Sequence, residues 1–164
     1  MKHLSITTML GRSVLVAALL ALAAGPAAAA SYTLRAGSTT VDHGDGPITA
    51  WGYALDATDV DNVDADGIIR VPGPTIYVPA GEDLTINLIN ELDEPTSIVI
   101  HGQKRVGTPV VDAGRVRAFT DEASPIGAAP ANVWFYTWSA AELKPGTFLY
   151  NRGSPPSKQL HMGL

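Results

Sequence analysis

The alternation of apolar and polar residues is clearest in the middle of the chain. Leu84, Ile86 and Leu88 are separated by single polar residues, and this two-residue period is typical of a strand with one buried face. A second β-branched run follows at Ser97–Ile100, and a β-rich run, Thr75–Val78, precedes them between two turn signals. The pattern therefore predicts two buried strands, at 84–88 and 97–100, joined by a polar connection.

The rest of the chain has the same character, with short apolar runs separated by Gly and Pro. Tyr32–Val41 reads as one strand or as a hairpin around Gly37, and Gly52 lies inside a further run as a bulge or a close backbone approach. The other expected strands are 48–55, 115–120, 133–138 and 147–150. Alternation directs Trp134, Tyr136 and Trp138 to one face, where core packing is expected. Many short strands with turn residues between them predict an all-β sandwich or barrel.

The first 30 residues differ in composition and read as a secretory signal peptide. Lys2 and Arg12 precede or flank an apolar run at 14–24, and Ala28–Ala30 supplies a small-residue cleavage site. We therefore expect residues 1–30 to be removed and residues 31–164 to form one exported domain, periplasmic or extracellular.

The net charge and the absence of cysteine exclude or disfavour several classes of function. The chain has a formal net charge of −5, and it becomes more acidic when Lys2 and Arg12 leave with the signal peptide. An acidic surface disfavours nucleic acid and anionic membrane as partners. The chain has no Cys, which excludes a thiol nucleophile and a thiolate metal site.

Several motifs carry a family resemblance. They are GPTIYVPAGEDLTINLINEL, then PTSIVIHGQ, Tyr136–Trp138, Pro145–Tyr150 and finally His161–Leu164. In this order they resemble the N-terminal plastocyanin-like domain of bacterial multicopper oxidases. The resemblance implies a Greek-key cupredoxin-like β-sandwich, copper as cofactor, and oxidoreductase activity with oxygen as acceptor in the assembled protein.

The resemblance also identifies the copper-ligand positions, and most of them have changed. The family's H-x-H-G motif places its two histidines at Val99 and His101, and the Y-H-x-H motif places its two at Asn151 and Gly153. Val and Gly have no ligating side chain, and copper favours imidazole and soft ligands over an Asn amide. His101 is thus the one retained candidate metal ligand. It is either completed by another chain or domain, or it is a structural or solvent-facing histidine, and the three or four ligands of ordinary sites favour the second reading.

Two other features are candidate metal sites, and for both an ordinary structural role is favoured. His43 and His161 have no His, Cys or carboxylate at ligand spacing, so we expect them to be exposed. The acidic loop Asp56–Gly67 imitates the front of a calcium loop, with oxygen side chains at alternate positions before Gly67. However, Gly73 stands where the closing Glu would be, so an ordinary solvated connection is favoured.

Three functions remain open from the sequence. The first is a degenerate, non-catalytic multicopper-oxidase-type domain that supplies scaffold and interdomain surface. The second is a stand-alone exported binding module without copper, and the third is a weak copper carrier that uses His101. The family continues beyond the position of Leu164 into a last strand, so we expect a truncated sandwich that further cupredoxin domains or another subunit would complete.

Overall fold

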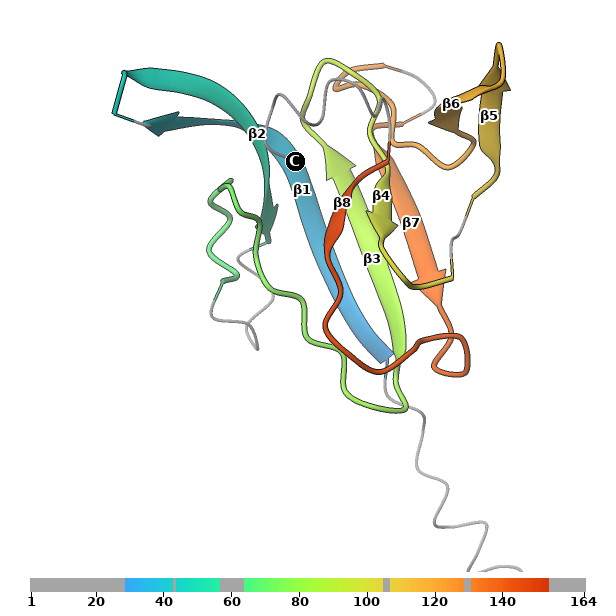
Figure 1. Cartoon of the computed structure of the whole chain (residues 1–164). Coiled ribbons are helices and arrows are strands. Elements are labelled where there is room, and N and C mark those ends of the chain that lie inside the picture. Colours follow the sequence, from blue (N-terminus) through green and yellow to red (C-terminus); the bar gives the residue numbers. More distant parts are fainter. Residues whose placement is uncertain (1–28, 43, 57–63, 105–106, 129–130, 154–164) are drawn as a thin grey trace, which may run out of the picture.

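The fold is described by a computed structural model that covers residues 29–42, 44–56, 64–104, 107–128 and 131–153, and within them it contains β-strands and no helix (Figure 1). The strands are β1 Ala29–Asp42, β2 Pro47–Leu55, β3 Asp83–Asn90, β4 Ile98–Ile100, β5 Pro109–Asp112, β6 Arg115–Phe119, β7 Val133–Trp138 and β8 Tyr150–Arg152. This all-β architecture confirms the predicted fold class. No segment of the described chain has the helical length and hydropathy of a membrane span.

The main layer is a four-stranded sheet with the order β2-β1-β3-β7. β1 pairs with β2 antiparallel and with β3 in parallel, and β3 pairs with β7 antiparallel. β1 runs without interruption through Gly37, so the alternative of a hairpin at this glycine is wrong. Its first two residues, Ala29 and Ala30, lie opposite Asp83 and Leu84 of β3.

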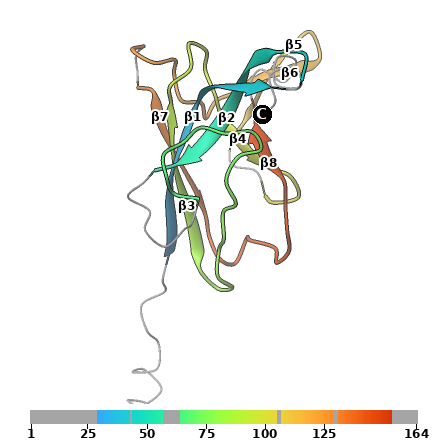
Figure 2. The ribbon, with the colours of Figure 1, turned by 90° about the vertical axis from the view of Figure 1, so that its left-hand side faces the viewer.

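The second layer is smaller. β4 and β8 form an antiparallel pair that lies across from β1, β3 and β7, and Figure 2 shows the two layers from the side. β5 and β6 form a separate hairpin that projects at one end of the molecule (Figure 1). The strand expected at 115–120 corresponds to β6, but the sequence predicted no strand at 109–112. Every residue of β5 is exposed, so this strand has no alternation of burial.

The core lies between the two layers and follows the predicted alternation. β3 alternates strictly between half-buried and buried residues. On β7, Tyr136 and Trp138 are 1% and 3% exposed whereas Phe135 is 66% exposed, and Trp134 packs against the core. This confirms that the indoles and Tyr136 face inward. The central buried apolar residues are Leu34, Leu55, Leu84, Ile86, Leu88, Leu92 and Ile98.

The backbone at Arg70, just before the β-rich run, lies against β2 at Gly52 and Tyr53. A Cβ atom on Gly52 would lie 2.3 Å from the carbonyl oxygen of Arg70, and Tyr53 and Arg70 exchange backbone hydrogen bonds of 3.3 and 3.2 Å. The register between β1 and β2 is unbroken here. Gly52 therefore marks a close backbone approach and not a bulge.

The β-rich run Thr75–Val78 is not part of a strand. Side chains bind its backbone groups: Asp64 accepts from the Thr75 N–H at 3.2 Å, and the Tyr77 carbonyl accepts from the Tyr32 hydroxyl. One strand prediction needs correction. The strand expected at 147–150 begins only at Tyr150 and continues to Arg152.

Candidate functional site

The structure brings the two family motifs together on the small β4–β8 sheet. Val99 lies directly opposite Asn151, and the neighbouring pair is Ile98 opposite Arg152. Ile98 and Arg152 are 3% and 1% exposed and turn into the core. Because successive side chains of a strand point to opposite faces, Val99 and Asn151 turn to the outer face. Two of the four ligand positions that the resemblance identifies, 99 and 151, thus lie opposite each other on one face of this sheet.

That surface does not provide a copper site. Val99 offers no donor atom, and Gly153 has neither a side chain nor room for one. A Cβ at Gly153 would lie 2.5 Å from Ser97 Oγ, 2.8 Å from Val99 Cγ2 and 3.1 Å from Phe119 Cδ2. Across the described residues, no group of three or more His, Cys, Asp or Glu side chains gathers in a way that could hold a metal ion. The residues present therefore do not fit the copper that the family implies.

His101 lies just past the end of β4 and its side chain is exposed. Its backbone N–H donates to the carbonyl of Leu149 at 2.9 Å, which continues the β4–β8 pairing. The residue lines a shallow pocket of about 180 Å³ formed by residues 98–104 and Trp138. His43 and His161 lie outside the described residues, so the proposed roles of these two histidines stay predictions.

Three polar side chains of this pocket, those of Gln103, Lys104 and Trp138, bind other groups of the protein. The Gln103 side-chain amide donates to the carbonyl of Lys144 and accepts from its N–H, both at 2.9 Å. The Trp138 indole N–H donates to the Lys104 carbonyl at 2.9 Å, and the Lys104 ammonium pairs with Glu142. These contacts join the turn after β4 to the loop after β7, so the pocket walls are mainly structural.

The sequence interpretation missed a buried guanidinium directly behind the ligand positions. Arg152 lies 4.7 Å above the centroid of the Trp51 ring and donates to the carbonyl of Pro95. Its Nη2 is 4.0 Å from Glu94 Oε2, while Nε and Nη1 have no partner. Burial lowers the pKa of Arg152, and the Tyr53 phenol, followed by the carboxylates of Glu94, Glu122 and Asp93, acts against that shift. The sequence did contain a signal for its burial. Position 152 lies between the two motif positions 151 and 153, so alternation along the strand would turn its side chain to the opposite face, toward the core.

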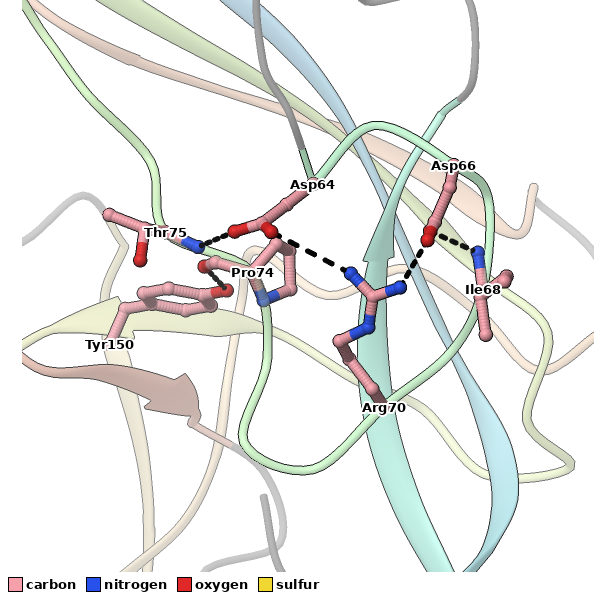
Figure 3. A network of polar contacts seen from close by, with 7 residues as sticks. All are labelled: Asp64, Asp66, Ile68, Arg70, Pro74, Thr75 and Tyr150. Atoms are coloured by element: carbon pink, nitrogen blue, oxygen red, sulfur yellow. Dashed lines mark hydrogen bonds and ion pairs between the residues drawn. The ribbon is translucent and has the colours of Figure 1, made fainter.

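Residues 57–63 of the acidic loop lie outside the described residues, and Arg70 binds the carboxylates of the part that follows them. Figure 3 shows Arg70 between Asp64 and Asp66. Arg70 Nη2 pairs with Asp66, and Nη1 lies 3.9 Å from Asp64 Oδ1. The N–H of Ile68 donates to Asp66 Oδ1 at 2.9 Å, and this bond, followed by that from Arg70, lowers the pKa of Asp66. A calcium ion at Asp64 and Asp66 would have to compete with Arg70. For the loop as a whole, the ordinary solvated connection stays a prediction.

Tyr150 connects β8 to the segment that follows this loop. Its hydroxyl donates to the Pro74 carbonyl (Figure 3), and its ring centroid is 5.6 Å from that of Tyr53. Burial raises the pKa of both phenols above the ordinary value of about 10, and the charge of Asp64 raises that of Tyr150 further. The two rings therefore stay neutral in the folded domain.

This predicts a loss of stability at alkaline pH. A phenol whose folded-state pKa is raised stabilises the fold below its unfolded pKa, and this contribution disappears as pH rises beyond about 10. Urea unfolding at increasing pH should show a falling free energy of unfolding, with a shallower fall in Tyr150→Phe. At neutral pH, Tyr150→Phe should cost about 1 kcal/mol for the lost hydrogen bond. Ionisation of Tyr150 near pH 10 in the folded protein, seen by absorbance, would contradict this prediction.

Comparison with known proteins agrees with the fold and the motifs. Residues 67–164 match the family model described as multicopper oxidase. The cell division protein FtsP of Proteus mirabilis (strain HI4320) is 30% identical over 81 residues, and L-ascorbate oxidase of Cucurbita maxima is 36% identical over 83 residues. These alignments cover 48% and 50% of this chain but 17% and 13% of those proteins.

Two solved structures have the same fold. A multicopper oxidase from Pseudomonas thermotolerans superposes with a TM-score of 0.59 at 24% identity, over 84% of this chain and 28% of that structure. A multicopper oxidase from Campylobacter jejuni gives 0.50 at 23% identity, over 81% of this chain and 24% of that structure. Since the family model covers more than half of the chain, the protein belongs to the multicopper oxidase family and carries a cupredoxin-like domain of that family.

Proposed function

We propose that this chain is a degenerate, copper-free cupredoxin-like domain of an exported multicopper-oxidase-type protein, in which it supplies scaffold and interdomain surface. The observation that carries the proposal is the outer face of the β4–β8 sheet. Val99 and Asn151 face each other there, and Gly153 has no space for a side chain. The family's copper chemistry, if the whole protein performs it, would then depend on other domains.

Ligand chemistry supports this proposal. Copper in proteins selects imidazole and soft sulfur ligands, and the four motif positions retain a single imidazole, that of His101. A single exposed imidazole gives no chelation. We therefore assign no oxidation step to residues of this chain.

Export and assembly complete the proposal. The cationic start, short apolar run and Ala-rich site of residues 1–30 support removal of a signal peptide. The solved multicopper oxidases are several times longer than the part that this chain matches. We accordingly propose further cupredoxin domains, or another subunit, as partners, and neither nucleic acid nor membrane for the mature chain.

Copper binding by the exported chain tests the proposal. The chain would be produced in an exporting host, and the mature form is expected to begin at Ser31 by mass spectrometry. After incubation with excess copper(II) and desalting, elemental analysis should find far less than one copper per chain, and a phenolic substrate should not be oxidised. One tightly held copper per chain would refute the copper-free function. Loss of this copper in His101→Ala would then identify the chain as a His101 copper carrier.

A second candidate is a stand-alone binding module, and the β5–β6 hairpin favours it. Val110, Val111 and Val116 are 44%, 59% and 41% exposed on this projecting hairpin, and exposed apolar clusters often mark interaction sites. The mass of the mature protein in its native cells separates the two candidates. A mass well above that of residues 31–164 supports the scaffold role within a larger oxidase, and a mass equal to it supports the stand-alone module.

A further inference from the structure

We propose that the former copper-ligand face is now a packed joint that requires the absence of a side chain at Gly153 and that holds the β5–β6 hairpin to the domain. This inference rests on the proposed copper-free function and extends it. It states that position 153 has lost the space for an imidazole as well as the donor atom.

The crowding around Gly153 comes from three directions. The closest atoms to a Cβ at this position would be Ser97 Oγ at 2.5 Å, Val99 Cγ2 at 2.8 Å and Phe119 Cδ2 at 3.1 Å. Side-chain Cβ atoms do not approach other heavy atoms within 3.0 Å in real structures. Any side chain at 153 must therefore displace at least Ser97 and Val99.

The neighbours have little freedom to move. Val99 is β-branched, so its χ1 rotamers are restricted, and its backbone is held in the β4–β8 pair. The N–H of Gly153 donates to the carbonyl of Ser97 at 2.9 Å, which fixes the separation of the two segments. Ser97 is 2% exposed, so its hydroxyl has no solvent space into which to turn.

The requirement for glycine is one of space and not of backbone conformation. Gly153 is not among the glycines with positive φ, which include Gly102, Gly114 and Gly146. An L-residue is thus compatible with the backbone at 153, and only the side-chain contacts exclude it. Because only space is limiting, the single methyl group that Gly153→Ala adds is enough to test the joint.

Phe119 connects the joint to the projecting hairpin. It is the last residue of β6 and is half-buried, whereas the other end of the hairpin is exposed. Its N–H donates to Glu122 Oε1 at 2.9 Å, and the neighbouring Thr120 N–H donates to the Thr108 carbonyl at 3.0 Å, which closes the base of the hairpin. A methyl group at Gly153 would press on the Phe119 ring and loosen this base.

Gly153→Ala in the mature chain tests the joint, with Asn151→His as the matched control. The control adds an imidazole to the same strand at a motif position that already has a side chain. Gly153→Ala should lower Tm by about 5–15 °C, the range expected for overpacking a domain of this size, and Asn151→His should change it by no more than about 2 °C. Native-state hydrogen exchange should rise in residues 109–119 of Gly153→Ala while β3 remains protected.

A double-mutant cycle with Val99→Ala keeps the test valid if Gly153→Ala does not fold. Removing the two Val99 methyl groups opens space, so the added methyl at 153 should cost much less in the Val99→Ala background. An unchanged Tm in Gly153→Ala, or an equal cost in both backgrounds, would overturn the joint. Copper binding by the unaltered chain would instead refute the proposed function, so the two failures are distinguishable.

Discussion

Replacement of Asn90 by alanine is expected to lower the free energy of unfolding by about 3–5 kcal/mol, because buried polar groups would lose their partners. Asn90 ends β3 and is fully buried. Its amide nitrogen donates to the carbonyls of Glu94 at 2.7 Å, Ser124 at 2.9 Å and Ala123 at 3.2 Å. Its amide oxygen accepts from the Leu92 N–H at 3.0 Å. The two amide N–H groups and the amide oxygen thus contact four backbone groups in two loops that pack against the end of the sheet.

Asn90→Asp is the matched variant for this prediction. It keeps the shape and the bond from Leu92, but it directs a carboxylate oxygen at three carbonyls in place of an amide donor. Urea denaturation should therefore show a loss at least as large as that of Asn90→Ala at neutral pH. If Asn90→Asp were as stable as the unaltered protein, the amide donors would not be important and the prediction would be wrong.

Arg152→Ala should have the next largest effect, a loss of about 2–4 kcal/mol. The truncation leaves a cavity between the two layers and removes the guanidinium from the Trp51 ring, 4.7 Å away. Arg152→Met should cost clearly less. It fills most of the volume and packs on Trp51, and it also removes a buried cation whose Nε and Nη1 have no partner. The Pro95 carbonyl, on an exposed residue, can be solvated when its donor is lost.

Arg152→Lys separates charge from stacking in the same experiment. Lysine keeps the buried charge but loses the planar group that lies over Trp51. We expect Arg152→Lys to be less stable than Arg152→Met in thermal and urea unfolding. A lysine variant as stable as the unaltered protein would show that the charge near Glu94, and not the contact with Trp51, holds β8 against the main sheet.

The candidate site could be located from the sequence but not constructed from it. The motif positions identified Val99, His101, Asn151 and Gly153, and the chemistry of these residue types was enough to argue against copper. The sequence could not show that a methyl group is excluded at Gly153, because Ser97, Val99 and Phe119 come from separate segments. The sequence likewise could not show that Arg70 binds Asp64 and Asp66 at the end of the acidic loop.

The sequence by itself determined the features that depend on local periodicity: the strands β3 and β7, the inward face of Tyr136 and Trp138, and the absence of most copper donors. Only the tertiary structure decided which segments meet. It opposed Val99 to Asn151, turned Arg152 onto Trp51, and left Thr75–Val78 outside the sheets because side chains bind its backbone. The physical reason is that alternation of side chains along a strand is a property of neighbouring residues. Free space and unpaired charge depend instead on contacts between residues far apart in the chain.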